Sequence, residues 1–227
     1  MEGLTLSDYL KRFKSCGENV KVAPDAFIEH PELMEVGNDV TFGRGFHMEG
    51  SPRECRIGDH VRFDPWTYIT GSGALLLDHH VQYYPGCFIA LGEFEDSVVK
   101  VGFHSHFAPR CVLYGWGCLE MAPYCNIAAH TVFATVAHKH RITDTPMAMT
   151  GPTAGPIVLE KDVWIGANAV VTMNTRIATG CVIGAGAVVT KDTQPMGIYG
   201  GVPAKQIGQR KPGVSAEDLQ RIAAGGA

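Results

Sequence analysis

A six-residue repeat of apolar side chains constrains this chain more than any other feature of its sequence. Neither an α-helix, whose period is about 3.6 residues, nor an alternating strand produces a period of six. The fourth residue after each of the middle anchors is small, and Gly or Ala often follows the anchor itself. From residue 159 the anchors are Leu159, Ile165, Val171, Ile177, Ile183 and Val189, and the small residues are Ala169, Thr175, Cys181 and Ala187.

The same repeat runs through the earlier part of the chain, with longer spacers between its groups. Its anchors are Val36, Phe42 and Met48, then Ile57, Phe63 and Ile69, then Leu77, Tyr83 and Ile89, then Val101, Phe107 and Leu113, then Met121, Ile127 and Phe133. Val22 and Ile28 indicate a partial first coil. Because Cys87, Cys111 and Cys125, like Cys181, fall on the small position, we expect these four thiols to be buried and not to act as nucleophiles.

The repeat predicts a parallel β-helix. Each anchor points into a three-sided coil, and successive coils stack as parallel strands. We expect a helix at about residues 5–15, in an N-terminal segment of residues 1–20. The β-helix itself is predicted over 21–207, with one long loop at 138–158. A tail and a second helix are predicted over 208–227, where Ser215 and Asp218 lie in a capping-box pattern.

Composition limits the function classes that are open to the chain. It has 227 residues, 45% of them hydrophobic and 19% charged, with a formal net charge of −4 and no long basic run. This balance argues against nucleic acid as the main partner. No apolar stretch is long enough to span a bilayer, and the N-terminus lacks a signal-peptide core, so we expect a cytoplasmic protein that does not bind membranes. Its seven cysteines are scattered and contain no C-x-x-C pair, which argues against a disulfide framework or a zinc ribbon.

Residues 162–207 resemble the C-terminal signature of hexapeptide-repeat acyltransferases. That signature reads V-W-I-G, then I-G-A-G-[SA]-V-V-T-K-D, then G-x-P-A-[KR], and the chain carries VWIG, IGAGAVVTKD and GVPAK in this order. The branch it resembles most is that of the galactoside, maltose and polysaccharide-sugar O-acetyltransferases. The resemblance implies a left-handed parallel β-helix and a homotrimer whose three active sites lie in clefts between neighbouring subunits. It also implies that acetyl-CoA is the co-substrate and that no metal is required.

The resemblance further implies a catalytic histidine at the start of the long loop. Histidine suits a general base because its pKa lies near neutrality. Counting forward from Ala128 places this residue at His138, whereas counting backward from Trp164 places it at His140. We take His138 as the base and keep His140 as the alternative, since residues two apart in an extended segment face the same side.

The other candidate site residues also follow from the resemblance. It implies that the donor lies against the backbone at Ala167 and Ala185 and against Trp164, Thr190, Lys191 and Lys205. Backbone amides at small residues can approach a ligand closely and hold an oxyanion, and lysines supply charge for phosphates. For the acceptor we consider His104, His106 and Arg110. Arg110 lies near the place where related enzymes hold an acceptor-contacting Asn, and the absence of that Asn argues against a galactoside.

Two other functions remain open on the sequence. γ-Class carbonic anhydrases share the β-helix and bind zinc through one histidine on a coil and two more, five residues apart, on the next. This chain instead has His-x-His at 104/106 and at 138/140. The second alternative is a non-catalytic scaffold, because a fold does not determine a function. We favour transfer of an acetyl group to a hydroxyl or amine of a small acceptor, with a sugar as the expected class.

Overall fold

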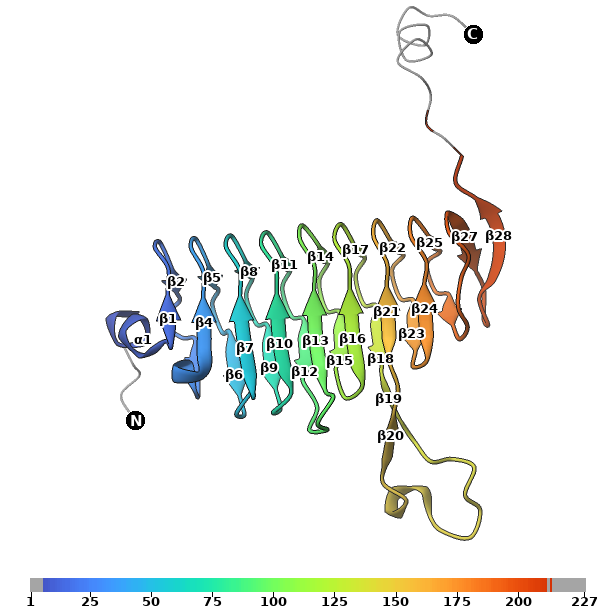
Figure 1. Cartoon of the computed structure of the whole chain (residues 1–227), viewed down its shortest axis with the longest axis horizontal. Helices are drawn as coiled ribbons and strands as arrows, with labels where there is room; N and C mark the ends of the chain where they lie inside the picture. Colours follow the sequence, from blue (N-terminus) through green and yellow to red (C-terminus); the bar gives the residue numbers. More distant parts are fainter. Residues whose placement is uncertain (1–5, 212, 214–227) are drawn as a thin grey trace, which may run out of the picture.

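The computed structural model describes residues 6–211 and 213, which form a three-sided β-solenoid (Figure 1). Short strands follow one another around the three sides, and along each side they pair in parallel from one coil to the next. The parallel β-helix predicted from the six-residue repeat is therefore confirmed. Among the described residues, no helix has the length and apolar character needed to cross a membrane.

Three sheets make up the solenoid. Sheet A contains β1 (Ser15–Cys16), β4 (Met34–Val36), β7 (Glu54–Ile57), β10 (Ala74–Leu77), β13 (Val98–Val101), β16 (Cys118–Met121), β21 (Ile157–Leu159) and β24 (Thr175–Ile177). Sheet B contains β2 (Lys21–Val22), β5 (Thr41–Phe42), β8 (Arg62–Phe63), β11 (Gln82–Tyr83), β14 (His106–Phe107), β17 (Asn126–Ile127), β22 (Trp164–Ile165), β25 (Val182–Ile183), β27 (Gly197–Gly200) and β28 (Lys205–Gln209). Sheet C contains β3 (Phe27–Ile28), β6 (His47–Glu49), β9 (Tyr68–Thr70), β12 (Phe88–Ala90), β15 (Val112–Tyr114), β18 (Val132–Ala134), β23 (Val170–Thr172) and β26 (Val188–Val189).

The predicted anchors form the core. From Val36 to Val189, none of them exposes more than 4% of its surface. The predicted small positions are buried with them, including all four cysteines of that column. Burial raises the pKa of Cys125 to about 11, which keeps this thiol protonated and unreactive at neutral pH.

Aromatic rings stack along the inside of sheet B. The ring centroids of Phe42 and Phe63 lie 5.4 Å apart, those of Phe63 and Tyr83 5.5 Å, and those of Tyr83 and Phe107 4.6 Å. The strands that carry them pair in register, so each ring lies directly over the ring of the next coil. The Tyr83 hydroxyl is buried in this stack without a hydrogen-bond partner among the described residues.

The N-terminal boundary differs from the prediction. Helix α1 spans Leu6–Arg12, and β1 already pairs in parallel with β4, so the solenoid begins at residue 15 and not at 21. Apolar side chains of this N-terminal segment pack directly against the first coil. Tyr9 and Phe13 pack onto the first coil with 5% and 7% of their surface exposed, and the chain then enters β1.

The C-terminal end is covered by the chain itself. Strands β27 and β28 form an antiparallel pair that extends sheet B to Gln209, two residues beyond the predicted boundary. On the last strand of sheet A, the Arg176 N–H donates to the Asp192 carboxylate (2.7 Å), and the Thr193 N–H donates to the Arg176 carbonyl (3.0 Å). The aspartate of the VVTKD segment therefore closes a sheet edge that would otherwise be open. The helix predicted from Ser215 lies outside the described residues.

The long loop contains a hairpin that the sequence analysis did not predict. Strand β19 (Val136–His138) pairs antiparallel with β20 (Pro152–Ala154), and the 3-10 helix Met147–Met149 lies between them. A second 3-10 helix, Pro31–Leu33, follows β3. The excursion begins two residues before the predicted start, and the chain is back in sheet A at Ile157. Thr135 holds the base of the hairpin: its hydroxyl donates to the Tyr114 carbonyl (2.6 Å), and its carbonyl accepts from the Gly155 N–H (2.9 Å).

Candidate active site

Three outward-facing side chains form a row on sheet B. His106 pairs in register with Asn126, and Asn126 pairs with Trp164, so the three follow one another along the solenoid axis. Each of them precedes a buried anchor, which turns its side chain to the outer face of the sheet. Trp164 is 54% exposed. The row therefore joins a predicted acceptor residue to a predicted donor residue.

A cavity of about 310 Å³ opens along this row, here named the sheet B cavity. Its lining is Tyr84, His106, Ala108, Asn126, Ile127, Ala128 and Trp164. The small side chains of Ala108 and Ala128 form the floor of the cavity. The larger side chains of Tyr84, His106 and Trp164 form its sides. The cavity is concave, mostly apolar and edged by a few polar groups, as ligand sites usually are.

His106 is neutral in this setting. Burial lowers its pKa below the usual histidine value, and the neighbouring His104 lowers it further, while a hydrogen bond with Asn126 acts in the opposite direction. His104 Nδ1 lies 3.3 Å from His106 Nε2. A neutral imidazole held between two partners can exchange hydrogen bonds with a hydroxyl at pH 7.

The predicted donor positions Ala167 and Ala185 occupy the corner between sheets B and C. Neither N–H donates to any acceptor within residues 6–211. In three earlier coils the same corner position holds Pro65, Pro85 and Pro109, which have no N–H at all. The coil therefore does not need an N–H here, and the amides of Ala167 and Ala185 are available to a ligand.

The remaining donor candidates lie on two other parts of the surface. Thr190 and Lys191 follow β26 at the corner between sheets C and A, and both are exposed. Lys205 begins β28, at the end of sheet B. In the part of the chain that the structure describes, neither lysine forms an ion pair.

His138 and His140 lie on the hairpin. With Lys139, Arg141, Ile142, Thr153 and Met173 they line a second cavity, of about 370 Å³. Both imidazoles therefore border the same cavity on the hairpin, and their part in an active site stays a prediction. The His138 carbonyl accepts from the His140 N–H at 2.8 Å, and His140 Nδ1 lies 3.2 Å from the same oxygen. No carboxylate of the described residues bonds to either ring.

One chain does not bring these groups together. The hairpin leaves the coil where sheet C ends and sheet A begins, whereas Trp164, Ala167 and Ala185 lie on sheet B and at its corner with sheet C. Figure 1 shows the hairpin projecting away from the solenoid below β18. The two cavities share no residue. His138 and Trp164 of a single chain therefore face different sides of the solenoid.

The acceptor candidates are only partly united. His104 lies at the corner between sheets A and B, next to His106, but Arg110 lies across the strand at the corner between sheets B and C. Sequence reasoning missed Asn126 and Tyr84. Asn126 could have been found, because it precedes the anchor Ile127 as Trp164 precedes Ile165. Tyr84 follows an anchor of an earlier coil, and only the stacking of the coils brings it to the cavity.

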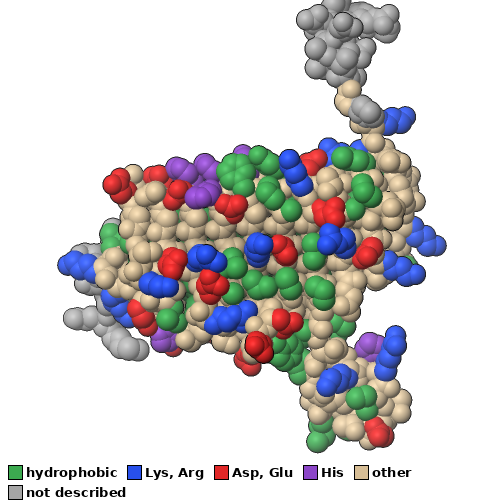
Figure 2. Space-filling model, viewed as in Figure 1, with side chains coloured by type: hydrophobic (Ala, Val, Ile, Leu, Met, Phe, Trp, Pro, Cys, Tyr) green, Lys and Arg blue, Asp and Glu red, His purple; other side chains and the backbone are tan. Residues whose placement is uncertain are grey.

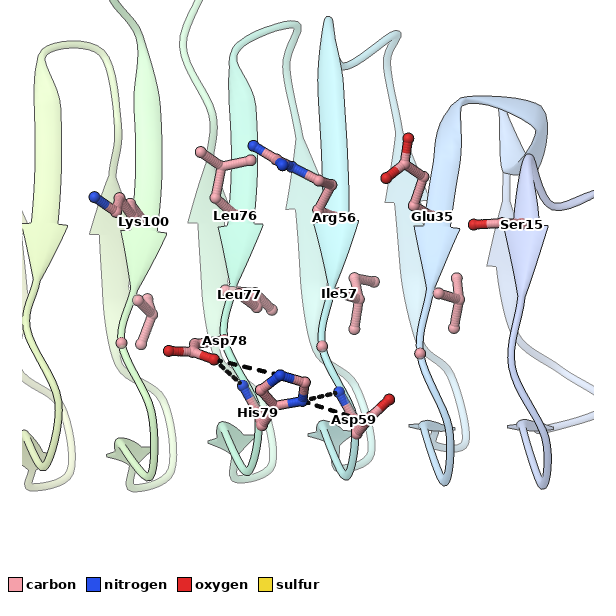
Figure 3. A pocket seen from close by; sticks show the side chains of 15 residues that line it. Ser15, Glu35, Arg56, Ile57, Asp59, Leu76, Leu77, Asp78, His79 and Lys100 are labelled. Carbon is pink, nitrogen blue, oxygen red and sulfur yellow. Dashed lines mark hydrogen bonds and ion pairs between the residues drawn. The ribbon is translucent and has the colours of Figure 1, made fainter.

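A cavity larger than these two lies elsewhere, on the outer face of sheet A (Figure 3). It measures about 530 Å³ and is edged by Arg56, Lys100 and His79. Its charged groups are paired: Arg56 lies 2.8 Å from Glu54 and Lys100 lies 2.6 Å from Glu120. None of the predicted site residues lines it. Among the described residues, no group of three or more His, Cys, Asp or Glu side chains is placed to hold a metal ion.

Comparison with known families matches one part of the chain. Residues 156–191 match the bacterial transferase hexapeptide family (six repeats). A segment of 58 residues is 45% identical to 2,3,4,5-tetrahydropyridine-2,6-dicarboxylate N-acetyltransferase of Staphylococcus aureus (strain JH9). That segment is 26% of this chain and spans about a quarter (24%) of the relative's length.

Comparison with solved structures extends over the whole fold. A variant of AntD, an N-acyltransferase from Bacillus cereus in complex with dTDP and coenzyme A, aligns with 99% of this chain and 97% of its own, at 19% identity and a TM-score of 0.53. The polySia-specific acetyltransferase NeuO aligns with 94% of this chain and 97% of its own, at 18% identity and a TM-score of 0.50. These likenesses establish the β-helix fold, and the family match identifies residues 156–191 as bacterial transferase hexapeptide repeats.

Proposed function

We propose that this protein is an acyl-CoA-dependent acyltransferase that moves an acetyl group to a hydroxyl or amine of a small acceptor. The observation that carries the proposal is the pair of available N–H groups at Ala167 and Ala185, next to the exposed Trp164 and the sheet B cavity. An N–H that the fold does not use, at a water-accessible corner, can hold the oxyanion of an acyl-transfer intermediate. We assign the oxyanion to Ala167, the nearer to Trp164, and the pantetheine arm to Ala185.

The reaction then needs a base on the acceptor. His138 takes the proton of the acceptor hydroxyl as the hydroxyl oxygen attacks the thioester carbonyl. The tetrahedral intermediate carries its negative charge on the former carbonyl oxygen. When it collapses, the carbon–sulfur bond breaks, and the leaving thiolate takes the proton held by His138 to give free coenzyme A. The acetyl ester remains on the acceptor.

The chain's surface fits acetyl-CoA as the co-substrate. A side chain added at Gly186 would meet nothing within 4 Å, so the backbone beside Ala185 is open to a long ligand. Lys191 and Lys205, both exposed, can each approach a phosphate group of the donor as a point charge. Thr190 lies beside Lys191 and adds a hydroxyl.

The separation of His138 and Trp164 supports a homotrimer. If each site takes its hairpin from one copy and its sheet B surface from the next, the two halves meet between subunits. The outer face of sheet C supports such packing because it carries an in-register row of mostly apolar side chains. The row consists of Phe27, His47, Tyr68, Phe88, Val112, Val132, Val170 and Val188. Apolar rows of this length are typical of surfaces that pack against another copy.

The related proteins point to the same reaction class. The tetrahydropyridine-dicarboxylate enzyme is an N-acetyltransferase, AntD is an N-acyltransferase crystallised with coenzyme A, and NeuO is an acetyltransferase specific for polySia. AntD has also been crystallised with dTDP-4-amino-4,6-dideoxyglucose, at a TM-score of 0.50 to this chain. We therefore expect a sugar-containing acceptor here.

The two hairpin histidines provide the test. We expect His138→Ala to lower kcat by about 10²–10⁴-fold and to leave the dissociation constant of acetyl-CoA nearly unchanged, as for a positioned general base. His140→Ala should cost little. Thiol release measures the first quantity and calorimetry the second. A large loss in His140→Ala alone would move the base to His140, and full activity in both variants would remove the hairpin from the chemistry.

A further inference from the structure

Two exposed cations lie at the corners on either side of sheet B, on coils that contribute to the sheet B cavity. Arg110 lies at the corner between sheets B and C, two residues after the cavity residue Ala108. Lys161 lies at the opposite corner, three residues before Trp164, and its Nζ is 5.4 Å from the ring centroid of Tyr124. Both side chains are exposed. Within residues 6–211, neither forms an ion pair or a side-chain hydrogen bond with a carboxylate.

The carboxylates around the cavity are already occupied. Asp64 accepts from Arg62 at 3.0 Å and from Gln82 at 3.2 Å. Asp162, which follows Lys161 in the chain, pairs with Arg210 at 2.8 Å. Asp64 and Asp162 are thus neutralised by partners of their own. What remains uncompensated around the cavity is the positive charge of Arg110 and Lys161.

The outer face of sheet A does not share this imbalance. Figure 2 shows acidic and basic side chains interspersed across the face that carries sheet A. There Lys14 pairs with Glu35 at 2.6 Å, and Lys100 pairs with Glu120 at 2.6 Å. A cation that lacks a partner beside a concave site attracts an anionic ligand, because the field of a cleft is focused on what enters it.

We propose that the acceptor is an anionic hydroxyl compound, whose carboxylate or phosphate group is bound by Arg110 and Lys161. The inference rests on the proposed function and names its substrate class. The guanidinium of Arg110 can hold a carboxylate or a phosphate through two parallel hydrogen bonds, and Lys161 adds a point charge from the opposite corner of sheet B. An amine acceptor would enter as an ammonium ion and be repelled by both cations. The atom that receives the acetyl group is therefore an oxygen.

The test is a matched set of acceptors with the full-length protein and acetyl-CoA. Methyl glucuronide supplies a carboxylate, glucose 1-phosphate a phosphate, methyl glucoside neither, and glucosamine an amine. We expect kcat/KM from thiol release to be about tenfold to a hundredfold higher for at least one acidic acceptor than for methyl glucoside, the size of one charge-assisted hydrogen bond. The acidic acceptor with the higher kcat/KM shows whether the site recognises a carboxylate or a phosphate.

Three variants test the residues. Arg110→Gln and Lys161→Gln should each remove most of the preference for the acidic acceptor. Arg44→Gln is the matched control, because Arg44 lies at the same corner in an earlier coil and is 3.8 Å from Asp25. It should keep the full preference. Equal melting temperatures confirm that all three variants are folded.

The outcomes separate the inference from the proposed function. If methyl glucoside or glucosamine is the best acceptor, or if Arg110→Gln and Lys161→Gln both keep the preference, the inference is wrong and the acyltransferase proposal stands. If acetyl-CoA raises the melting temperature but neither acidic acceptor releases thiol, the inference again falls. If acetyl-CoA does not bind and no acceptor reacts, the proposed function falls as well.

Discussion

Replacing Ala167 by proline separates the use of its N–H in catalysis from any use in folding. The N–H has no acceptor in residues 6–211, and proline occupies the same corner at positions 65, 85 and 109. Removing it should therefore cost the fold almost nothing, whereas losing a buried and paired N–H would cost about 1–3 kcal/mol. If the N–H holds the oxyanion, its loss should lower kcat by about 10²–10³-fold, or roughly 2.7–4 kcal/mol in the transition state.

Ala129→Pro is the control, because Ala129 occupies the same corner one coil earlier. It should retain wild-type kcat and the wild-type melting temperature. Thiol release with a saturating acceptor gives kcat, and thermal unfolding gives stability. If Ala167→Pro is folded and fully active, the N–H of Ala167 is not part of the site. If Ala167→Pro and Ala129→Pro lose activity equally, the effect belongs to the corner and not to the oxyanion.

Two further predictions concern donor binding and the core. Acetyl-CoA should raise the melting temperature because it binds the folded state. Lys191→Glu should reduce that rise, because a contact with a phosphate group becomes repulsive. An unchanged dissociation constant of acetyl-CoA in this variant would remove Lys191 from the donor site. Tyr83→Phe should raise the free energy of unfolding by about 1–2 kcal/mol, because it removes a buried hydroxyl that lacks a partner among the described residues. Chemical denaturation measures this change, and a loss of stability would mean that the hydroxyl is paired after all.

The fold was largely predictable from the sequence because one rule repeats along it. Each side of a coil has interior room for one large and one small side chain, so the period of six is a packing requirement. Ile165 and Ala169 illustrate it, since both are fully buried. The start of the solenoid was not predictable in the same way. Strand β1 has no anchor of the regular type, and it is held by backbone pairing with β4.

The site was predictable only as separate pieces. The position of Trp164 before an anchor fixes its outward direction, and this could be deduced from the repeat. The hairpin could not be deduced, because β19 and β20 depend on antiparallel pairing between residues that lie outside the six-residue pattern. The unused N–H groups at Ala167 and Ala185 became visible only through the backbone hydrogen bonds of the corners. Sequence alone shows alanine where three other coils have proline. The structure adds that the N–H of each alanine is left without an acceptor among the described residues.

The central claim is that each active site combines the hairpin of one copy with the sheet B surface of another, and mixing two inactive variants tests it most directly. His138→Ala lacks the base and Ala167→Pro lacks the oxyanion donor, so each homotrimer should be nearly inactive. In trimers reassembled from an equal mixture, about one site in four should combine two intact halves from neighbouring subunits, by random assembly of a symmetric oligomer. The account predicts that about a quarter of wild-type kcat returns on mixing. A mixture that stays as inactive as its parents, although light scattering shows mixed trimers, would contradict it.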